Sequence, residues 1–216
     1  MNTIIERLEK IKLNIASINP VQQVNIIAVS KTFSIEHINP LIKYGHKHFG
    51  ENKVQEATAK WSSVVKNNTN IKLHMVGRLQ SNKVKDAVKL FHYIHSLDSQ
   101  KLADTLAKHQ SSLNKDLKYF IQVNIGNEIQ KSGIPVNELD PFYNYCKNEI
   151  KLNILGLMII PPNEIDPSKY FNSLNELNKS LALKELSMGM SADYINAVQH
   201  GATFVRLGSS IFGARS

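Results

Sequence analysis

The chain has a single cysteine, Cys146, so it can form no disulfide within itself. That scarcity fits a reducing compartment, and we expect a cytoplasmic protein. The sequons at Asn67 and Asn178 are then no evidence of glycosylation. The longest apolar run, residues 154–160, is too short to cross a bilayer. The first residues mix charges at helical spacing and lack the apolar core of a signal peptide.

No stretch rich in proline, glycine or serine divides the chain, and it contains no internal repeat. We therefore expect residues 1–216 to form a single domain with a substantial core. The formal charge is +8, from 26 basic and 18 acidic side chains. The lysines are scattered, with few aromatic residues among them for base stacking, so we expect no specific nucleic-acid binding. We also expect no membrane association.

Arginine is the scarce basic residue, with four arginines against 22 lysines. The guanidinium group is a fixed planar charge that a lysine cannot replace. An arginine at the end of a predicted strand therefore attracts attention, and Arg206 has that position.

Short apolar runs alternate with helical patterns along the chain. After an amphipathic helix predicted over residues 3–18, eight strand-then-helix units follow. The runs lack the apolar–polar alternation of half-exposed strands, which indicates strands buried on both faces, as in a parallel sheet. The strands are predicted at residues 24–31, 48–52, 71–76, 93–97, 117–123, 152–160, 183–188 and 203–207.

The intervening segments have helical periodicity, and Ser34, Asp98 and Ser191 are predicted to cap three of them. The alternation predicts an α/β fold, and eight units allow the sheet to close into a (β/α)8 TIM barrel with an extra N-terminal helix. An open, doubly wound sheet is the alternative. Even spacing of the units, and the absence of a glycine-rich dinucleotide turn after the first strand, favour the barrel. The helices are predicted at residues 34–44, 54–65, 79–90, 100–113, 137–148, 168–181, 191–201 and 209–214.

The first strand ends in Lys31, and barrels bind their ligands at the carboxyl ends of the strands. A lysine with its stem in an apolar barrel mouth can lose its proton and form a Schiff base with an aldehyde. On this stretch alone, a lysine that ends a strand and extends to water is the simpler interpretation, because the chain has 22 lysines.

Phosphate groups are often held after strands seven and eight of such barrels, at the start of a short extra helix. Strand seven leaves through residues 187–191 and strand eight through residues 206–210, and both exits are rich in serine and glycine. Glycine lets the backbone approach an anion, and free N–H groups at a helix start point toward it. Two ordinary helix caps are the alternative for each exit taken alone.

Closure of the barrel would pair strand one with strand eight and make Lys31 and Arg206 neighbours at one rim. An aldehyde-reactive lysine, a phosphate cradle and an arginine between them describe a site for pyridoxal 5′-phosphate (PLP). In such a site the lysine binds the aldehyde carbon, the cradle binds the phosphate, and Arg206 faces the pyridine nitrogen.

The sequence also resembles the pyridoxal phosphate homeostasis proteins, a family similar in fold to the barrel domain of alanine racemase. The resemblance covers nearly the whole chain and rests on six ordered blocks: residues 28–32, 49–56, 74–83, 131–133, 186–193 and 205–215. It implies that Lys31 forms the Schiff base, that Ser187, Gly208 and Ser209 hold the phosphate, and that Arg206 faces the ring nitrogen. Asn52 is expected near the cofactor, and Ser209 keeps the hydroxyl of the threonine often found there.

An arginine at the ring nitrogen cannot give up its proton, so it makes PLP a weak electron sink. Alanine racemase is similar in this arginine but takes a second base from a separate domain, and this chain ends just after the barrel. The resemblance therefore implies a non-catalytic carrier that holds PLP and passes it on, possible recipients being PLP-requiring apoenzymes. A racemase-like enzyme is the alternative, and weak activity of that kind stays open. We expect a monomer.

Other chemistries have weaker signals. The pairs His46/His48 and His92/His95 lack the further ligands of a metal site, so no metal is predicted. His74 is predicted to be a buried core histidine. The segment from Gly126 to Ser132 fails as a nucleotide-binding loop because Gln130 replaces the required glycine. Lys131 in that loop is a candidate secondary cation for the phosphate or second aldehyde-binding amine, and Cys146 is predicted to be a small apolar core residue.

Overall fold

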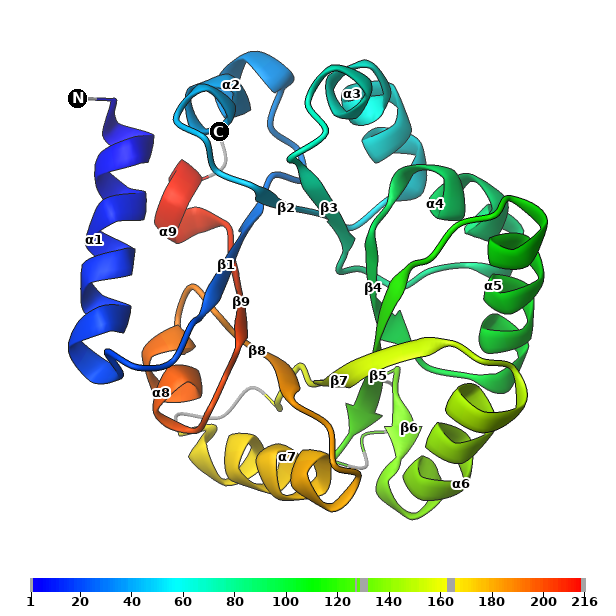
Figure 1. The fold of residues 1–216 in the computed structure, drawn as a ribbon. Helices are drawn as coiled ribbons and strands as arrows, with labels where there is room; N and C mark the ends of the chain where they lie inside the picture. Colours follow the sequence, from blue (N-terminus) through cyan, green and yellow to red (C-terminus); the bar gives the residue numbers. More distant parts are fainter. Residues whose placement is uncertain (1, 127, 129–131, 163–165, 215–216) are drawn as a thin grey trace.

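The computed structural model describes residues 2–126, 128, 132–162 and 166–214. Eight parallel strands run in a closed ring, confirming the predicted TIM barrel (Figure 1). The strands are β1 (Asn25–Val29), β2 (His48–Glu51), β3 (Lys72–Met75), β4 (Tyr93–Leu97), β5 (Lys118–Asn124), β7 (Asn153–Met158), β8 (Glu185–Met190) and β9 (Phe204–Leu207).

The ring closes where the first and last strands meet. Parallel pairing of β1 with β9 matches Ile27 with Arg206 and Ala28 with Leu207. Pairing of β4 with β5 completes the other half of the ring. A two-residue strand that the sequence did not predict, β6 (Ile134–Pro135), adds to β5 outside the ring.

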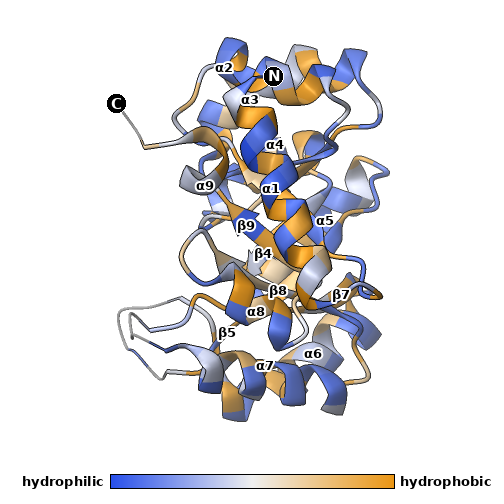
Figure 2. Ribbon diagram, turned by 90° about the vertical axis from the view of Figure 1, so that its left-hand side faces the viewer, coloured by the Kyte–Doolittle hydropathy of each residue, from blue (hydrophilic) through white to orange (hydrophobic). Residues whose placement is uncertain are grey.

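Helices surround the ring. The amphipathic segment at the amino end forms α1, which lies outside the barrel against α8 and α9 and shows hydrophobic and hydrophilic residues interleaved along its length (Figure 2). The helices are α1 (Thr3–Ile18), α2 (Ile35–Lys43), α3 (Val54–Asn67), α4 (Val84–Leu90), α5 (Gln100–Ser112), α6 (Leu139–Asn144), α7 (Ser168–Ser180), α8 (Tyr194–Gln199) and α9 (Ser209–Phe212).

Two packing regions differ in chemistry. The layer between strands and helices is apolar and includes Trp61 and Cys146. Cys146 is fully buried, in agreement with its prediction as a core residue. The ring interior has a small apolar cluster around Ile27, Phe120 and Phe204. Polar side chains are buried in the interior as well, and these are His74, His95, Ser187, Gln122 and Arg206.

Several helix starts differ from the predictions. The helix predicted from residue 79 begins at Val84 after a 3₁₀ turn, and the one predicted over 137–148 is a short α6 followed by a π turn at Tyr145–Glu149. Ser99, not Asp98, takes the cap position of α5. The prediction that Ser191 caps α8 is wrong, because α8 begins after Asp193 and the Ser191 hydroxyl bonds elsewhere.

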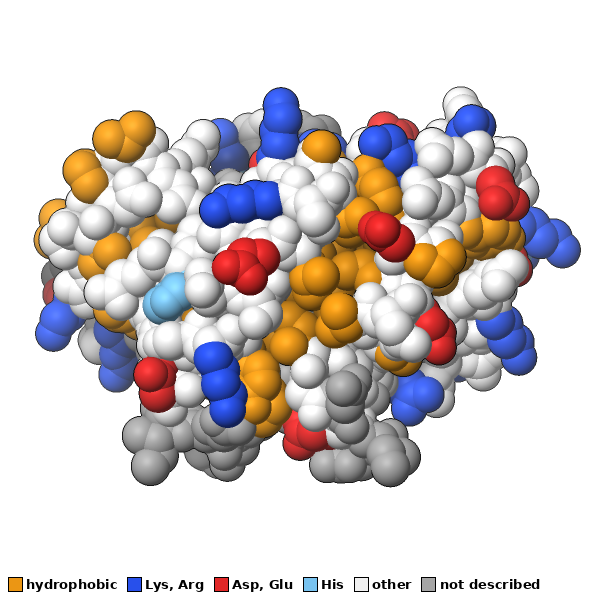
Figure 3. Space-filling model, turned by 90° about the horizontal axis from the view of Figure 1, so that it is seen from below, with side chains coloured by type: hydrophobic (Ala, Val, Ile, Leu, Met, Phe, Trp, Pro, Cys, Tyr) orange, Lys and Arg blue, Asp and Glu red, His pale blue; other side chains and the backbone are white. Residues whose placement is uncertain are grey.

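Basic side chains are spread over the outside. On the face shown in Figure 3, lysine and arginine side chains lie among acidic ones and do not gather in one patch. No helix in the described part of the chain is long and apolar enough to span a membrane.

Candidate functional site

A cleft of about 480 Å³ opens at the carboxyl ends of β1 and β9. Ile27 and Val29 face the ring interior from β1, and Lys31, two residues beyond the end of the strand, lines the cleft beside Val29. Arg206 is paired with Ile27 and has the same orientation on β9. Lys31 and Arg206 both line the cleft, so the closed sheet brings these two residues together.

Ser30 anchors the backbone immediately before Lys31. Its hydroxyl donates to Glu51 Oε1 at 2.8 Å, and its carbonyl oxygen accepts a hydrogen bond from Lys60 Nζ at 2.9 Å. Since Ser30 is fully buried, these bonds form away from water and fix the end of β1.

Thr32 anchors the backbone immediately after Lys31. Its φ of 70° is in the left-handed region, which a β-branched residue rarely adopts. The Thr32 N–H donates to Glu56 Oε1 at 2.6 Å, and this short, charge-assisted bond offsets the backbone strain. Lys31 therefore lies between two fixed residues at a sharp turn of the chain.

Glu51 is the centre of the network that supports this turn. It is fully buried at the end of β2, and its Oε1 accepts from Lys60 Nζ and from Trp61 Nε1, each at 2.9 Å. Lys60 also pairs with Glu56 at 3.1 Å. Sequence reasoning assigned no role to these residues. The available signal was the block at residues 49–56, with Lys60 one helical turn after Glu56.

Arg206 is only 5% exposed and is held by neutral oxygens. Its Nη1 donates to the carbonyl oxygen and to the hydroxyl of Ser187, both at 2.8 Å, and its Nη2 donates to the Ile159 carbonyl at 2.7 Å. Burial lowers the pKa of Arg206 to about 10, against the opposing effect of Asp193, so the guanidinium stays charged at neutral pH. The group has more N–H donors than these bonds use, and it lines the cleft.

Ser187 has a different position from the one predicted for a phosphate ligand. It is fully buried behind Arg206, and its hydroxyl lies 2.8 Å from His95 Nδ1. The β8–β9 pairing shifts register between Ser187 and Met190, so the residues after the shift, and not Ser187, reach the cleft. Ser187 thus supports Arg206 from the interior of the ring.

Ser191 takes the place at the cleft that was predicted for Ser187. Its hydroxyl oxygen accepts the N–H groups of Gly208 and Ser210, each at 3.3 Å, and lies 3.1 Å from the Ser210 hydroxyl. Gly208 and Ser209, at the exit of the last strand, line the same cleft, and their role as phosphate ligands stays a prediction. One wall of the cleft is therefore made of hydroxyls and backbone amides from two strand exits.

Two glycines shape this wall. Gly189 has a φ of 92°, and a Cβ there would lie 2.6 Å from the Ala197 Cβ, so the turn after β8 requires glycine. A Cβ on Gly208 would approach only Val29, at 3.5 Å. The volume beside Gly208 is therefore open to a ligand.

Asn52 lies after β2 and lines a second cleft, of about 1030 Å³, at the same end of the barrel. Arg78 and Asp98 line this second cleft too, and burial raises the pKa of Asp98. Asn52 Oδ1 is buried and has no hydrogen-bond partner among the described residues. A buried acceptor in that condition is available to a ligand donor. Lys131 falls outside the described residues, so its predicted role stays a prediction.

The histidine pairs of the sequence do not gather as metal ligands. His46 Nε2 bonds to the backbone oxygen of His48, and His92 Nδ1 accepts the N–H of Leu73. Among the residues that the structure describes, no group of three histidine, cysteine, aspartate or glutamate side chains is placed to hold a metal. His95 contacts Ser187 in the interior.

Comparison with known proteins places the chain among relatives. The family described as "Alanine racemase, N-terminal domain" matches residues 7–216. A pyridoxal phosphate homeostasis protein of Pasteurella multocida is 36% identical over 228 residues, covering 99% of this chain and 98% of its own length. Its namesake in Aquifex aeolicus is 38% identical over 199 residues, covering 88% and 86%. The chain belongs to the pyridoxal phosphate homeostasis protein family.

The membership confirms the resemblance drawn from the six sequence blocks. Among solved structures, PipY of Synechococcus elongatus with PLP bound is similar, with a TM-score of 0.87 and 33% identity over 97% of this chain and 100% of that one. Alanine racemase of Clostridium difficile has a TM-score of 0.76 at 13% identity, covering all of this chain and 57% of its own. That second likeness shows that the chain shares the barrel fold of alanine racemase.

Proposed function

We propose that this protein binds PLP in the cleft between β1 and β9 and holds it for use elsewhere in the cell. The observation that carries the proposal is one cleft lined by Lys31, Arg206 and the hydroxyl-and-amide wall at Gly208. The volume of about 480 Å³ is in the range of small-ligand sites. Relatives over nearly the full length are named for PLP homeostasis, and PipY has PLP bound, which supports the same ligand here.

The donors present fit the chemical groups of PLP. Lys31 would supply an amine able to hold the aldehyde group of PLP covalently. Arg206 supplies a cation for the ring nitrogen. The amides and hydroxyls of Ser191, Gly208 and Ser209 suit a phosphate, since backbone N–H groups at a helix start bind anions. Asn52 offers an acceptor from the neighbouring cleft.

The surroundings of Arg206 support holding over catalysis. PLP, when bound, supplies an electron sink whose strength depends on a protonated ring nitrogen, for which enzymes commonly provide an acidic residue. Arg206 is charged at neutral pH, so it would offer the ring nitrogen a hydrogen bond without protonating it. The relatives are named homeostasis proteins and not enzymes, which supports the same conclusion.

We further propose that the protein acts as a cytoplasmic monomer and releases PLP to apoenzymes that require it. The alternative is a racemase-like enzyme, because alanine racemase has the same barrel fold. Incubating the PLP-loaded protein with single enantiomers of alanine, and following optical purity, separates the two. Racemisation that disappears in Lys31→Ala would overturn the carrier proposal.

The test of binding is direct. Purified protein with added PLP should become yellow, and borohydride should fix the cofactor on Lys31, as located by peptide mass mapping. Lys31→Ala should lose the borohydride label, because no amine remains there to form the C=N bond. Lys53→Ala is the matched control, since Lys53 is an exposed lysine that lines the second cleft and not the first. A colourless wild type, or unchanged labelling in Lys31→Ala, would refute the proposal.

A further inference from the structure

Three histidines form a hydrogen-bonded row inside the barrel. His48 on β2 lies 2.9 Å from His74 on β3 (Nδ1 to Nε2), and His74 lies 2.9 Å from His95 on β4 (Nδ1 to Nε2). His95 Nδ1 then meets the Ser187 hydroxyl at 2.8 Å, and Ser187 accepts from Arg206. We call this set the histidine relay: His48, His74, His95 and Ser187.

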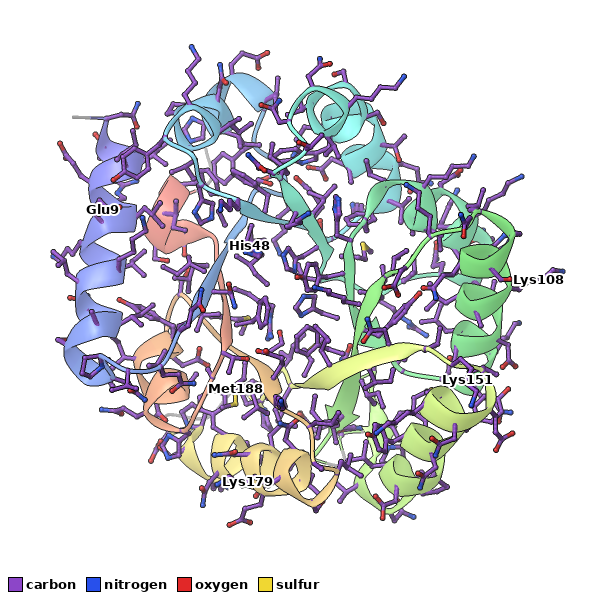
Figure 4. The ribbon with its side chains drawn as sticks, viewed as in Figure 1. Glu9, His48, Lys108, Lys151, Lys179 and Met188 are labelled. Carbon is purple, nitrogen blue, oxygen red and sulfur yellow. The ribbon has the colours of Figure 1, made fainter. Side chains whose placement is uncertain are left out.

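The histidine relay connects the two ends of the barrel. His48 is partly exposed at the start of β2 and lines a cleft of about 360 Å³ at the amino ends of the strands. Figure 4 shows His48 on the inner side of β2. His74, His95 and Ser187 are fully buried, and Arg206 lines the cleft at the carboxyl end. The relay is therefore open to solvent at one end and to the candidate cofactor cleft at the other.

Arginine fixes the direction of the relay. A guanidinium can only donate, so the Ser187 hydroxyl oxygen is the acceptor of Arg206 Nη1–H. In the hydrogen bonds described for the buried Ser187 hydroxyl, His95 Nδ1 is the acceptor for its hydrogen, and this leaves the His95 proton on Nε2. A neutral imidazole has one donor and one acceptor. His95 Nε2–H therefore donates to His74 Nδ1, and His74 Nε2–H donates to His48 Nδ1. Every histidine in the relay is then the Nε2–H tautomer.

Neutral rings are consistent with the surroundings of the relay. Burial lowers the pKa of His48 to about 4 and holds the pKa values of His74 and His95 well below the usual range. Aromatic rings pack on it: His74 stacks on Tyr93 at 4.2 Å, and His95 on Phe120 at 4.4 Å. The charged or titratable groups acting on the relay are Lys47, Lys72 and Lys118 beside His48, His46 and His92 beside His74, and Arg206 beside His95.

We propose that the histidine relay positions Arg206 for the cofactor. The hydrogen bonds among the buried histidines would then affect how the Arg206 guanidinium is held through Ser187. The coupling follows from the single direction of the row: a break at any ring leaves a buried N–H or ring nitrogen without a partner, and the cost of that unpaired group falls on the residues that hold Arg206. The effect on the cofactor rests on the proposed function, whereas the tautomers belong to the protein alone.

The test uses His74→Phe, which keeps an aromatic ring on Tyr93 and touches neither Ser187 nor Arg206 by any bond described above. In wild type, ¹⁵N NMR of the side chains should show His48, His74 and His95 as neutral Nε2–H tautomers at pH 7. In His74→Phe the Nε2–H of His95 loses its acceptor, while Ser187 still donates to His95 Nδ1; His95 should therefore keep its Nε2–H tautomer, and its Nε2 and Hε2 resonances should shift. PLP affinity should then fall by about two- to tenfold, as for the loss of one hydrogen bond.

His92→Gln is the matched control, because His92 is also a partly buried histidine with a lowered pKa but lies outside the relay. It should leave the His95 Nε2–H resonances and PLP affinity unchanged. His95→Gln, which retains a donor and an acceptor, should restore part of the affinity lost in His95→Phe. An Nδ1–H or charged His95 in wild type, or a folded His74→Phe with unchanged His95 Nε2–H resonances, would overturn the relay.

The two proposals fail separately. If no variant binds PLP, the proposed function is refuted, but the tautomers of the ligand-free protein still decide whether the relay has its stated direction. If PLP binds and His95 does not respond to His74→Phe, the relay is refuted and the cofactor site stands.

Discussion

Lys31 and Arg206 are on neighbouring strands and line the same cleft, yet they are held in different ways. Around Lys31 the protein fixes the backbone, through a buried charged network of Glu51, Lys60 and Glu56. Around Arg206 it fixes the side chain itself, through neutral oxygens that continue into the histidine relay.

The difference suits the two proposed tasks. A lysine that forms and breaks a C=N bond needs a mobile side chain on a fixed main chain, and Ser30 and Thr32 provide the fixed part. An arginine that donates to a ring nitrogen needs one orientation and a retained proton. Neutral acceptors hold its orientation and leave its charge available to the ligand.

The largest expected effect is acid sensitivity of three histidines at or just before the starts of β2 and β4, of which His48 belongs to the relay behind Arg206. The pKa values of His46, His48 and His92 are each lowered to about 4, so the unfolded chain binds more protons than the folded one between pH 6.5 and 4. Stability is therefore fully present above pH 6.5 and falls as the pH drops toward 4, by on the order of 3 kcal/mol or more in total. Urea unfolding at a series of pH values measures it. His46→Gln should flatten the curve, and an unchanged curve would contradict this cause.

Breaking the Lys31 side should have the next largest effect. Glu51→Ala leaves Lys60 as a buried charge without its main partner and orphans the Trp61 N–H, so the free energy of unfolding should fall by about 3–5 kcal/mol. The matched control is Asp86→Ala, which removes an exposed pair with Lys89 and should cost under about 1 kcal/mol. Equal losses in the two variants, measured by urea unfolding, would show that the Glu51 network does not support the fold.

The smallest expected effect is on phosphate affinity, where Ser191 at the cleft wall is compared with Ser187 behind Arg206. Ser191→Ala removes the hydroxyl that organises the Gly208 and Ser210 amides, so affinity for PLP and for competing inorganic phosphate should fall by about two- to tenfold. Ser187→Ala should leave phosphate competition unchanged, because Ser187 lies behind Arg206. Titration calorimetry with both ligands distinguishes them. A larger phosphate effect from Ser187→Ala would return the phosphate role to Ser187.

The barrel could be predicted because strand and helix patterns alternate in the sequence, and closure then placed Lys31 beside Arg206. Ser187 and Ser191 could not be told apart, because a register shift after Ser187 decides which of them reaches the cleft. The three relay histidines are on separate strands, and only the register of the closed ring aligns them. In the sequence they are spaced like unrelated strand residues.

The positive φ of Thr32 has a consequence for the position of Lys31. A single carboxylate from the first turn of α3 holds the residue that follows Lys31 in an unfavourable conformation. Through this bond a helix outside the ring of strands contributes to the direction in which the chain leaves β1. The main-chain position of Lys31 thus depends on a side chain of α3 as well as on the pairing of the strands.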